Sequence, residues 1–225
     1  MSATSLRNIA RLTEKRMAPY AWTQVDDMSL SSEEQTLLNA LSRRLSYYDT
    51  SFVNEATIWS RAIYPMLVLA EQGEVLAWSQ VPIRAQYPHV ELQGVVDGML
   101  AQGIIGMADA PYYLIVVEAK RGLESQDPRF QLCGQLLAAA RLNWECDQQP
   151  VQEIFGCYTI IDTWKFLRAT VQDIETDAPH LLIEPSREYT QKTEAETILK
   201  ILKRIVAGST APSQRGNDDR VVINQ

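Results

Sequence analysis

The chain has 225 residues, of which 46% are apolar, and its formal net charge is −7. That length suits one substantial core with extensions rather than two full-sized domains. Its longest apolar runs fall far short of the roughly 20 residues that cross a bilayer, and its N-terminus has no apolar block of the kind found in secretory signals. We therefore expect a cytoplasmic protein without membrane contact. The expected parts are an N-terminal extension (1–29), a single domain (30–207) and a flexible tail (208–225).

The charge and the potential metal ligands narrow the classes of function. Proteins that hold nucleic acid through bulk electrostatics are usually basic, so this acidic chain would need a local basic patch, a metal ion or a partner protein to do so. The three cysteines form no Cys-x-x-Cys pair, which argues against a disulfide framework and a zinc finger. The two histidines lie far apart in sequence. Any bound metal is therefore expected to be a hard cation held by oxygen ligands.

Helix signals dominate the first third of the chain. A Ser-x-x-Glu capping box at Ser31 predicts a helix that runs to about Tyr48. A second helix is predicted over 55–72, with a kink or a restart at Pro65.

Strands and further helices follow in an order that indicates the fold class. Three consecutive strands, mostly antiparallel, are predicted over 75–87, 90–101 and 112–121, because these segments are rich in β-branched and aromatic residues. The remaining predictions are a helix over 130–146, strands over 153–161 and 164–171 joined by a hairpin at Asp162-Thr163, and a final helix with a capping box at Thr193. This order predicts an α+β fold with a mixed β-sheet flanked by helices.

The third of the consecutive strands carries the sharpest chemical signal. Its apolar run ends in Glu118 and Lys120, which alternation along a strand places side by side on one face. Charged residues at the end of a buried strand are costly unless they are paired or bound. Asp97 lies near the end of the preceding strand, and antiparallel pairing in a suitable register would bring it to Glu118. Two converging carboxylates beside a lysine suit binding of Mg²⁺, activation of water and stabilisation of charge on a phosphate.

An acid on one strand, followed by Glu-x-Lys at the end of the next and then by a helix, resembles the PD-(D/E)XK nuclease superfamily. The resemblance covers about residues 55–161, and this segment is similar to the nuclease domains of type I restriction subunits. It implies a restriction-endonuclease-like core, with the element order αβββαβ and a helix added at each end. It also implies that Asp97 and Glu118 bind Mg²⁺ or Mn²⁺, and that Lys120 positions the attacking water or neutralises developing charge.

The resemblance extends to residues around these three. Glu55 matches the extra acid that many members carry in the helix before the strands, and Gln131 and Gln135 match a glutamine motif in the helix that follows them. Because Gln131 and Gln135 are one helical turn apart, they are expected on one face. Arg121 and Arg129 flank the expected site and are candidates for phosphate contact.

Two positions depart from the pattern, and several residues also have plain structural explanations. Val96 stands where the motif has its proline, and Gln135 stands where related nucleases often have tyrosine; neither change removes a metal ligand. Glu118 and Lys120 could form a surface ion pair. Glu55 could be a first-turn residue favoured by the helix dipole.

Two functions of different classes follow. The first is a metal-dependent nuclease that hydrolyses phosphodiester bonds, foremost in DNA, in defence, repair or mobile-element biology. The second is a non-catalytic binding or regulatory subunit with the nuclease fold, acting as a homodimer or with a partner protein. The complete Asp97, Glu118 and Lys120 set favours the first function, whereas the acidic charge favours the second.

Overall fold

The computed structural model describes residues 2–47, 53–104, 107–118 and 127–210. Its strands are β1 (Arg11–Glu14), β2 (Val75–Gln86), β3 (Glu91–Ile104), β4 (Met107–Glu118), β5 (Val151–Ile160), β6 (Thr163–Gln172) and β7 (His180–Thr190). Its helices are α1 (Ala3–Ile9), α2 (Ser32–Ser46), α3 (Glu55–Ile58), α4 (Tyr64–Leu69), α5 (Pro128–Asp147) and α6 (Gln191–Thr210), with a 3-10 turn η1 (Ala21–Thr23) and a π-helical turn η2 (Trp59–Ile63).

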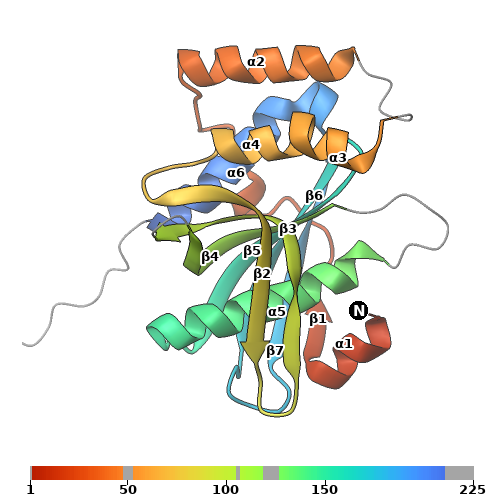
Figure 1. Ribbon diagram of the computed structural model, residues 1–225, viewed down its shortest axis with the longest axis vertical. Coiled ribbons are helices and arrows are strands. Elements are labelled where there is room, and N and C mark those ends of the chain that lie inside the picture. The colour runs from red at the N-terminus through yellow and green to blue at the C-terminus, as the bar shows by residue number, and fades with distance from the viewer. Residues whose placement is uncertain (1, 48–52, 105–106, 119–126, 211–225) are drawn as a thin grey trace, which may run out of the picture.

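The seven strands form one mixed sheet in the order β1-β7-β6-β5-β4-β3-β2. The pairs β2–β3 and β3–β4 are antiparallel, as predicted for three consecutive strands, whereas β4 runs parallel to β5 and β1 runs parallel to β7. Helices cover both faces of the sheet (Figure 1). The α+β fold with a mixed, helix-flanked sheet is therefore confirmed.

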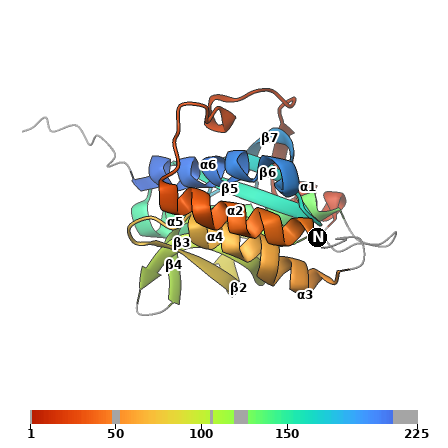
Figure 2. The same ribbon diagram turned by 90° about the horizontal axis from the view of Figure 1, so that it is seen from above.

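Two apolar cores lie on opposite faces of this sheet. Helices α3, α4 and α6 lie on one face, and α2 stacks on the outer side of α4 and α6 (Figure 1 and Figure 2). These helices pack residues such as Leu38, Leu67 and Leu202 into what we call the α6-side core. Helices α5 and α1 cover the other face and contribute Leu136 and Leu6 to the α5-side core. Burial of this apolar area is the main force that holds the layers together.

The helix starts agree with the sequence in the first part of the chain. At the start of α2, the Ser31 hydroxyl accepts the Glu34 N–H, and the Glu34 carboxylate accepts the Ser31 N–H at 2.7 Å, which is the predicted capping box. The helix predicted over 55–72 restarts near Pro65, as expected. The Tyr64 N–H donates to the Trp59 carbonyl, five residues back, and this bond forms the π-helical turn directly before Pro65.

The capping box predicted at Thr193 is wrong. Helical structure begins at Gln191, directly after β7, and is kinked at Glu194 (φ −128°, ψ 25°), whose carboxylate instead accepts the Thr190 N–H at 2.9 Å. The Gln191 side chain fixes this earlier start, because it is buried and accepts the Trp164 Nε1–H at 2.9 Å.

Other differences concern strands. The segments that form β1 and β7 were not predicted as strands, and β4 begins at Met107, five residues before the predicted 112. The hairpin between β5 and β6 turns at Ile161-Asp162, because Thr163 already pairs with Ile160. The predicted end of the third strand, 119–121, lies outside the described residues.

The two ends of the chain also bear on the expected organisation. The expected N-terminal extension supplies α1 and β1, and its Leu6 is fully buried. Helix α6 continues through Gly208 to Thr210, and the rest of the expected tail lies outside the described residues. Among the helices that the structure describes, none is both long and apolar enough to cross a membrane.

Candidate functional site

The backbone register places the two expected metal ligands at the same end of the β3–β4 pair. Gly98 pairs with Val116, so Asp97 and Glu118 lie one and two positions beyond this last pair, respectively. On the other side of β4, Glu118 pairs with Thr159 of β5. The register that the sequence required is therefore present in the backbone.

Several of the predicted site residues cannot be placed in full. The side chain of Glu118 lies outside the described residues, as do Lys120 and Arg121. Convergence of Asp97, Glu118 and Lys120 in one pocket therefore stays a prediction, and the described geometry of the site is that around Asp97.

Asp97 lies at a break in the alternation of side chains along β3, which we call the sheet break. Residues two apart along a strand normally share a face. Val96, however, is packed in the α5-side core, whereas a Cβ at Gly98 would point at Trp59, which packs on the α6-side core. The alternation of side chains is therefore broken at Asp97.

The neighbouring strand changes faces at the same level. Ala77 of β2 belongs to the α6-side core, but Val81 packs on the α5-side core. Between them, Gln80 has a left-handed backbone with φ of 54°. Gln80 stands opposite Asp97, because the pairs on either side of it are Ser79 with Gly98 and Val81 with Val96.

Two hydrogen bonds from β2 hold Asp97 at this break, and a third holds one of their donors. The Trp59 indole Nε1–H donates to the Ser79 hydroxyl at 3.2 Å, and that hydroxyl donates to the Asp97 carbonyl oxygen at 3.1 Å. The Gln80 amide Nε2–H donates to Asp97 Oδ1 at 3.3 Å. Both the backbone and the carboxylate of Asp97 are thus tied to β2, and through Trp59 to the start of the helical layer.

Glu55 lies in the helix that supplies Trp59. It occupies the first turn of α3, whose N-cap Asn54 accepts the Thr57 N–H at 2.9 Å. Because Glu55 and Trp59 are four residues apart, they project from neighbouring positions on the same side of the helix. Glu55 is half-buried and lies one helical turn before Trp59.

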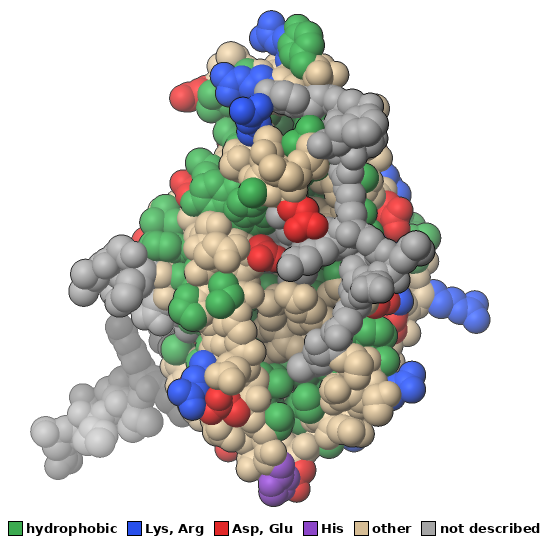
Figure 3. All heavy atoms as spheres, turned by 45° about the vertical axis from the view of Figure 1, so that its right-hand side comes forward, with side chains coloured by type: hydrophobic (Ala, Val, Ile, Leu, Met, Phe, Trp, Pro, Cys, Tyr) green, Lys and Arg blue, Asp and Glu red, His purple; other side chains and the backbone are tan. Residues whose placement is uncertain are grey.

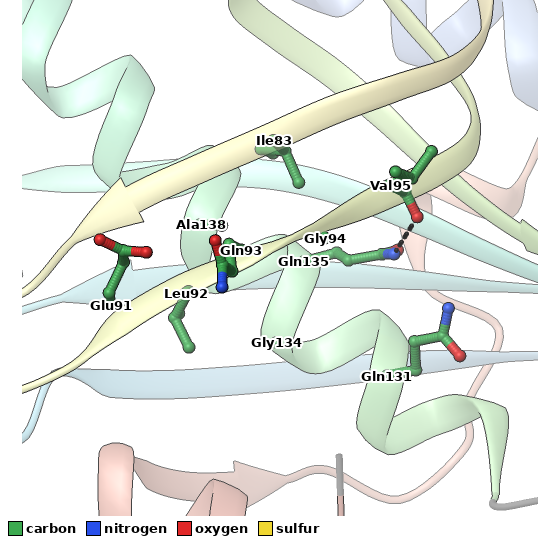
Figure 4. A pocket seen from close by; sticks show the side chains of 10 residues that line it. All are labelled: Ile83, Glu91, Leu92, Gln93, Gly94, Val95, Gln131, Gly134, Gln135 and Ala138. Atoms are coloured by element: carbon green, nitrogen blue, oxygen red, sulfur yellow. Dashed lines mark hydrogen bonds between the residues drawn. The ribbon is translucent and has the colours of Figure 1, made fainter.

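Gln131 and Gln135 line one pocket, with a volume of about 320 Å³, between α5 and β3 (Figure 4). This arrangement confirms that they share a face of the helix. The Gln135 Nε2–H donates to the Val95 carbonyl oxygen at 3.2 Å, two residues before Asp97, whereas Gln131 is exposed and points away from Val95. Gln135 is only 8% exposed, and its Oε1 has no hydrogen-bond partner among the described residues. Gln135 thus supports the strand that carries Asp97 from the α5 side.

The Arg129 guanidinium pairs with the nearby Asp127 carboxylate and is therefore not free to contact phosphate. Its guanidinium donates to the Asp127 carboxylate through Nε at 2.9 Å and Nη2 at 2.6 Å. These hydrogen bonds hold the pKa of Asp127 below its usual range. Phosphate contact by Arg129 would therefore have to compete with Asp127.

Charge and unsatisfied groups around the site bear on what it could hold. Figure 3 shows acidic side chains in the middle of one face, whereas the Lys and Arg side chains visible there lie toward its margin. The described residues contain no group of three or more His, Cys, Asp and Glu side chains placed to hold a metal. The Thr159 hydroxyl, next to Glu118 in the sheet, is fully buried and has no hydrogen-bond partner among them. A buried polar group of this kind commonly marks a place that water or an ion completes.

The sequence interpretation missed Trp59, Ser79, Gln80 and Thr159. The only signal for them was the polar pair Ser79-Gln80, which interrupts the apolar alternation of β2. In comparisons with known proteins, no family model matches the chain and no curated protein is detectably similar to it.

Proposed function

We propose that the chain is a metal-dependent nuclease with a restriction-endonuclease-like core, and that it hydrolyses phosphodiester bonds in DNA. The observation that carries this proposal is the register of β3 and β4, which brings Asp97 and Glu118 to the same end of neighbouring strands. The element order supports it, since a helix precedes these strands and α5 and the parallel strand β5 follow them. Fold alone would not suffice, because one fold serves many functions.

The chemistry proposed for the site uses oxygen ligands and one cation of the chain. Asp97 and Glu118 would hold Mg²⁺ or Mn²⁺ through their carboxylate oxygens, which are the ligands that hard cations prefer. When bound, the metal would lower the pKa of water and stabilise charge on the phosphate. Lys120 would position the attacking water or neutralise the developing charge, and Glu55 would add a further acid from α3. Among the described residues, the buried Thr159 hydroxyl beside Glu118 has no hydrogen-bond partner, which fits a site that a ligand completes.

A non-catalytic binding or regulatory subunit is the second candidate. The observation that favours it is the net charge of −7, which opposes nucleic-acid binding by bulk electrostatics. Under this alternative the same fold would act with a partner protein or as a homodimer.

The decisive experiment compares purified wild-type protein with two variants on supercoiled, linear and single-stranded DNA and on RNA, with Mg²⁺, Mn²⁺ or a chelator. Asp97→Asn should weaken metal binding measured by calorimetry and abolish cleavage. Lys120→Met removes a charge that repels the cation, so metal binding should survive while cleavage falls on the order of a hundredfold or more.

Asp26→Asn is a matched control, because Asp26 is an exposed aspartate outside the helices and strands, and it should behave as wild type. Equal cleavage by Lys120→Met and wild type would refute the role of Lys120. No cleavage of any polymer under any metal would favour the second candidate.

A further inference from the structure

Gln80 has an unusual backbone for its place in the fold. Four described residues other than glycine have positive φ: Gln80, Gln148, Ile161 and Asp173. Gln148 caps the C-terminus of α5, Ile161 forms the β5–β6 turn and Asp173 follows β6, where such conformations are common. Gln80 instead lies in the middle of β2, with paired residues on both sides. A left-handed residue there is strained, and such strain persists only where its surroundings impose it.

The packing of Trp59 on both strands imposes this conformation. Trp59 binds the Ser79 hydroxyl on one side of Gln80, and its indole fills the space in front of Gly98 across the ladder. A Cβ at Gly98 would lie 2.5 Å from Trp59 Cη2, so the indole has room only because residue 98 is glycine. Packing against the α6-side core therefore fixes the orientation of the strands at Ser79 and Gly98. Packing against the α5-side core fixes the opposite orientation at Val81 and Val96. The left-handed backbone of Gln80 joins these two orientations within β2.

The result of this strain is contact with the carboxylate of Asp97. The left-handed turn places the Gln80 amide where its Nε2–H donates to Asp97 Oδ1 at 3.3 Å, while Ser79 holds the Asp97 carbonyl. Backbone strain of this kind concentrates at functional sites, where it serves to preorganise a group. Hydrogen bonds from neighbouring residues are also what orients a metal-binding carboxylate.

We infer that Gln80 is a positioning residue for Asp97, held in a strained conformation so that its amide orients the Asp97 carboxylate. The inference rests on the proposed function, because it assigns Gln80 to the orientation of a metal ligand. A residue that serves only the fold would stabilise it. A strained positioning residue costs stability and improves binding, so its replacement should move the two quantities in different directions.

Two substitutions separate the strain from the amide. Gln80→Gly removes both and should leave Tm unchanged or raise it by roughly 2–4 °C. Gln80→Met keeps an unbranched side chain and the left-handed strain but removes the donor, so it should not raise Tm. Both variants should weaken Mn²⁺ binding, measured by calorimetry, by about 10–100-fold, as is typical when a group that orients a metal ligand is lost.

Gln148→Gly is the matched control, since Gln148 is the same residue type with a φ of 56° at the end of α5. The Gln148 amide donates to the Trp144 and Glu145 carbonyl oxygens at the helix end, so Gln148→Gly also loses these hydrogen bonds and is the control for metal binding alone: it should leave Mn²⁺ binding unchanged. Asp97→Asn serves as the reference. If Asp97→Asn binds Mn²⁺ like wild type, the proposed function fails. If Asp97→Asn weakens binding but both Gln80 variants bind like wild type, the inference alone fails. A fall of several degrees in the Tm of Gln80→Gly would also overturn it, because Gln80 would then be a structural residue.

Discussion

An alanine at position 98 would place a methyl group against the indole that packs on the sheet break. Its Cβ would lie 2.5 Å from Trp59 Cη2, 2.9 Å from Trp59 Cζ2 and 3.1 Å from Leu67 Cδ1. Carbon atoms in contact prefer roughly 3.5–4.0 Å, so the indole has to move by on the order of 1 Å. Overpacking of this kind costs about 1–3 kcal/mol. At roughly 2–4 °C for each kcal/mol in a chain of this size, Gly98→Ala should lower Tm by roughly 2–12 °C.

The measurement is thermal unfolding followed by circular dichroism, with Gly94→Ala as the matched control. Gly94 lies on the same strand, and no atom lies within 4 Å of a Cβ built there. Gly94→Ala should therefore leave Tm unchanged or raise it slightly, because alanine restricts the unfolded chain. Equal Tm values for the two variants would refute the close packing of Trp59 on Gly98. A shifted indole would also lose its hydrogen bond to Ser79, so any metal binding at Asp97 should weaken in Gly98→Ala and not in Gly94→Ala.

Two further predictions concern ionisable groups. Hydrogen bonds from Lys203, and then from the Ser31 backbone, lower the pKa of Glu34. The ionised Glu34 carboxylate therefore stabilises the fold above about pH 4.5, and this stabilisation is lost as pH falls through the lowered folded-state pKa. Glu34→Gln should accordingly lower Tm at pH 7 and lower it much less at pH 3. An equal loss of Tm at both pH values would contradict this. Burial raises the pKa of Cys133 to about 12 and that of Cys157 well above its usual range, whereas Cys146 is exposed. At pH 8 Ellman's reagent should therefore titrate Cys146 quickly and the other two thiols only after unfolding, and rapid reaction of all three would be the contrary result.

The elements that could be predicted are those whose signal lies within a short stretch of sequence. The capping box at Ser31 and the β-branched strands over 75–87 and 90–101 needed only local patterns, and the structure has them with small shifts of their ends. Strand β1 is different, because four residues of mixed polarity carry no periodicity. It forms because Arg11–Glu14 pairs with β7, a segment more than 160 positions away in sequence. Long-range pairing of this kind cannot be seen in either segment alone.

The candidate site divides in the same way. The acids Asp97 and Glu118 stand out in sequence because charged residues at the ends of apolar strands are costly, and the backbone register places them at the same end of neighbouring strands. Gln80 and Ser79 stand out only as a polar pair in β2, and the left-handed backbone of Gln80 could not be predicted, because glutamine has no preference for that conformation. Its conformation follows from the packing of Trp59 against Gly98, and this contact joins helix and strand segments that the sequence pattern treats separately.

Burial along β3 explains why the acid occurs at position 97 and not at a neighbouring position. Before it, Val95 is 49% exposed, so that part of the strand is covered on one face only; after it, Met99 and Leu100 are fully buried, so both faces are covered. An acid one or two residues further on would be desolvated on all sides, at a cost that a single cation would have to offset. An acid two residues earlier would lie in water, where its attraction for a cation is weakened by solvent. Asp97 is partly buried and lies between the part of β3 that is covered on one face and the part that is covered on both. The break in side-chain alternation at Gln80 and Asp97 allows a polar residue to lie there without entering either core.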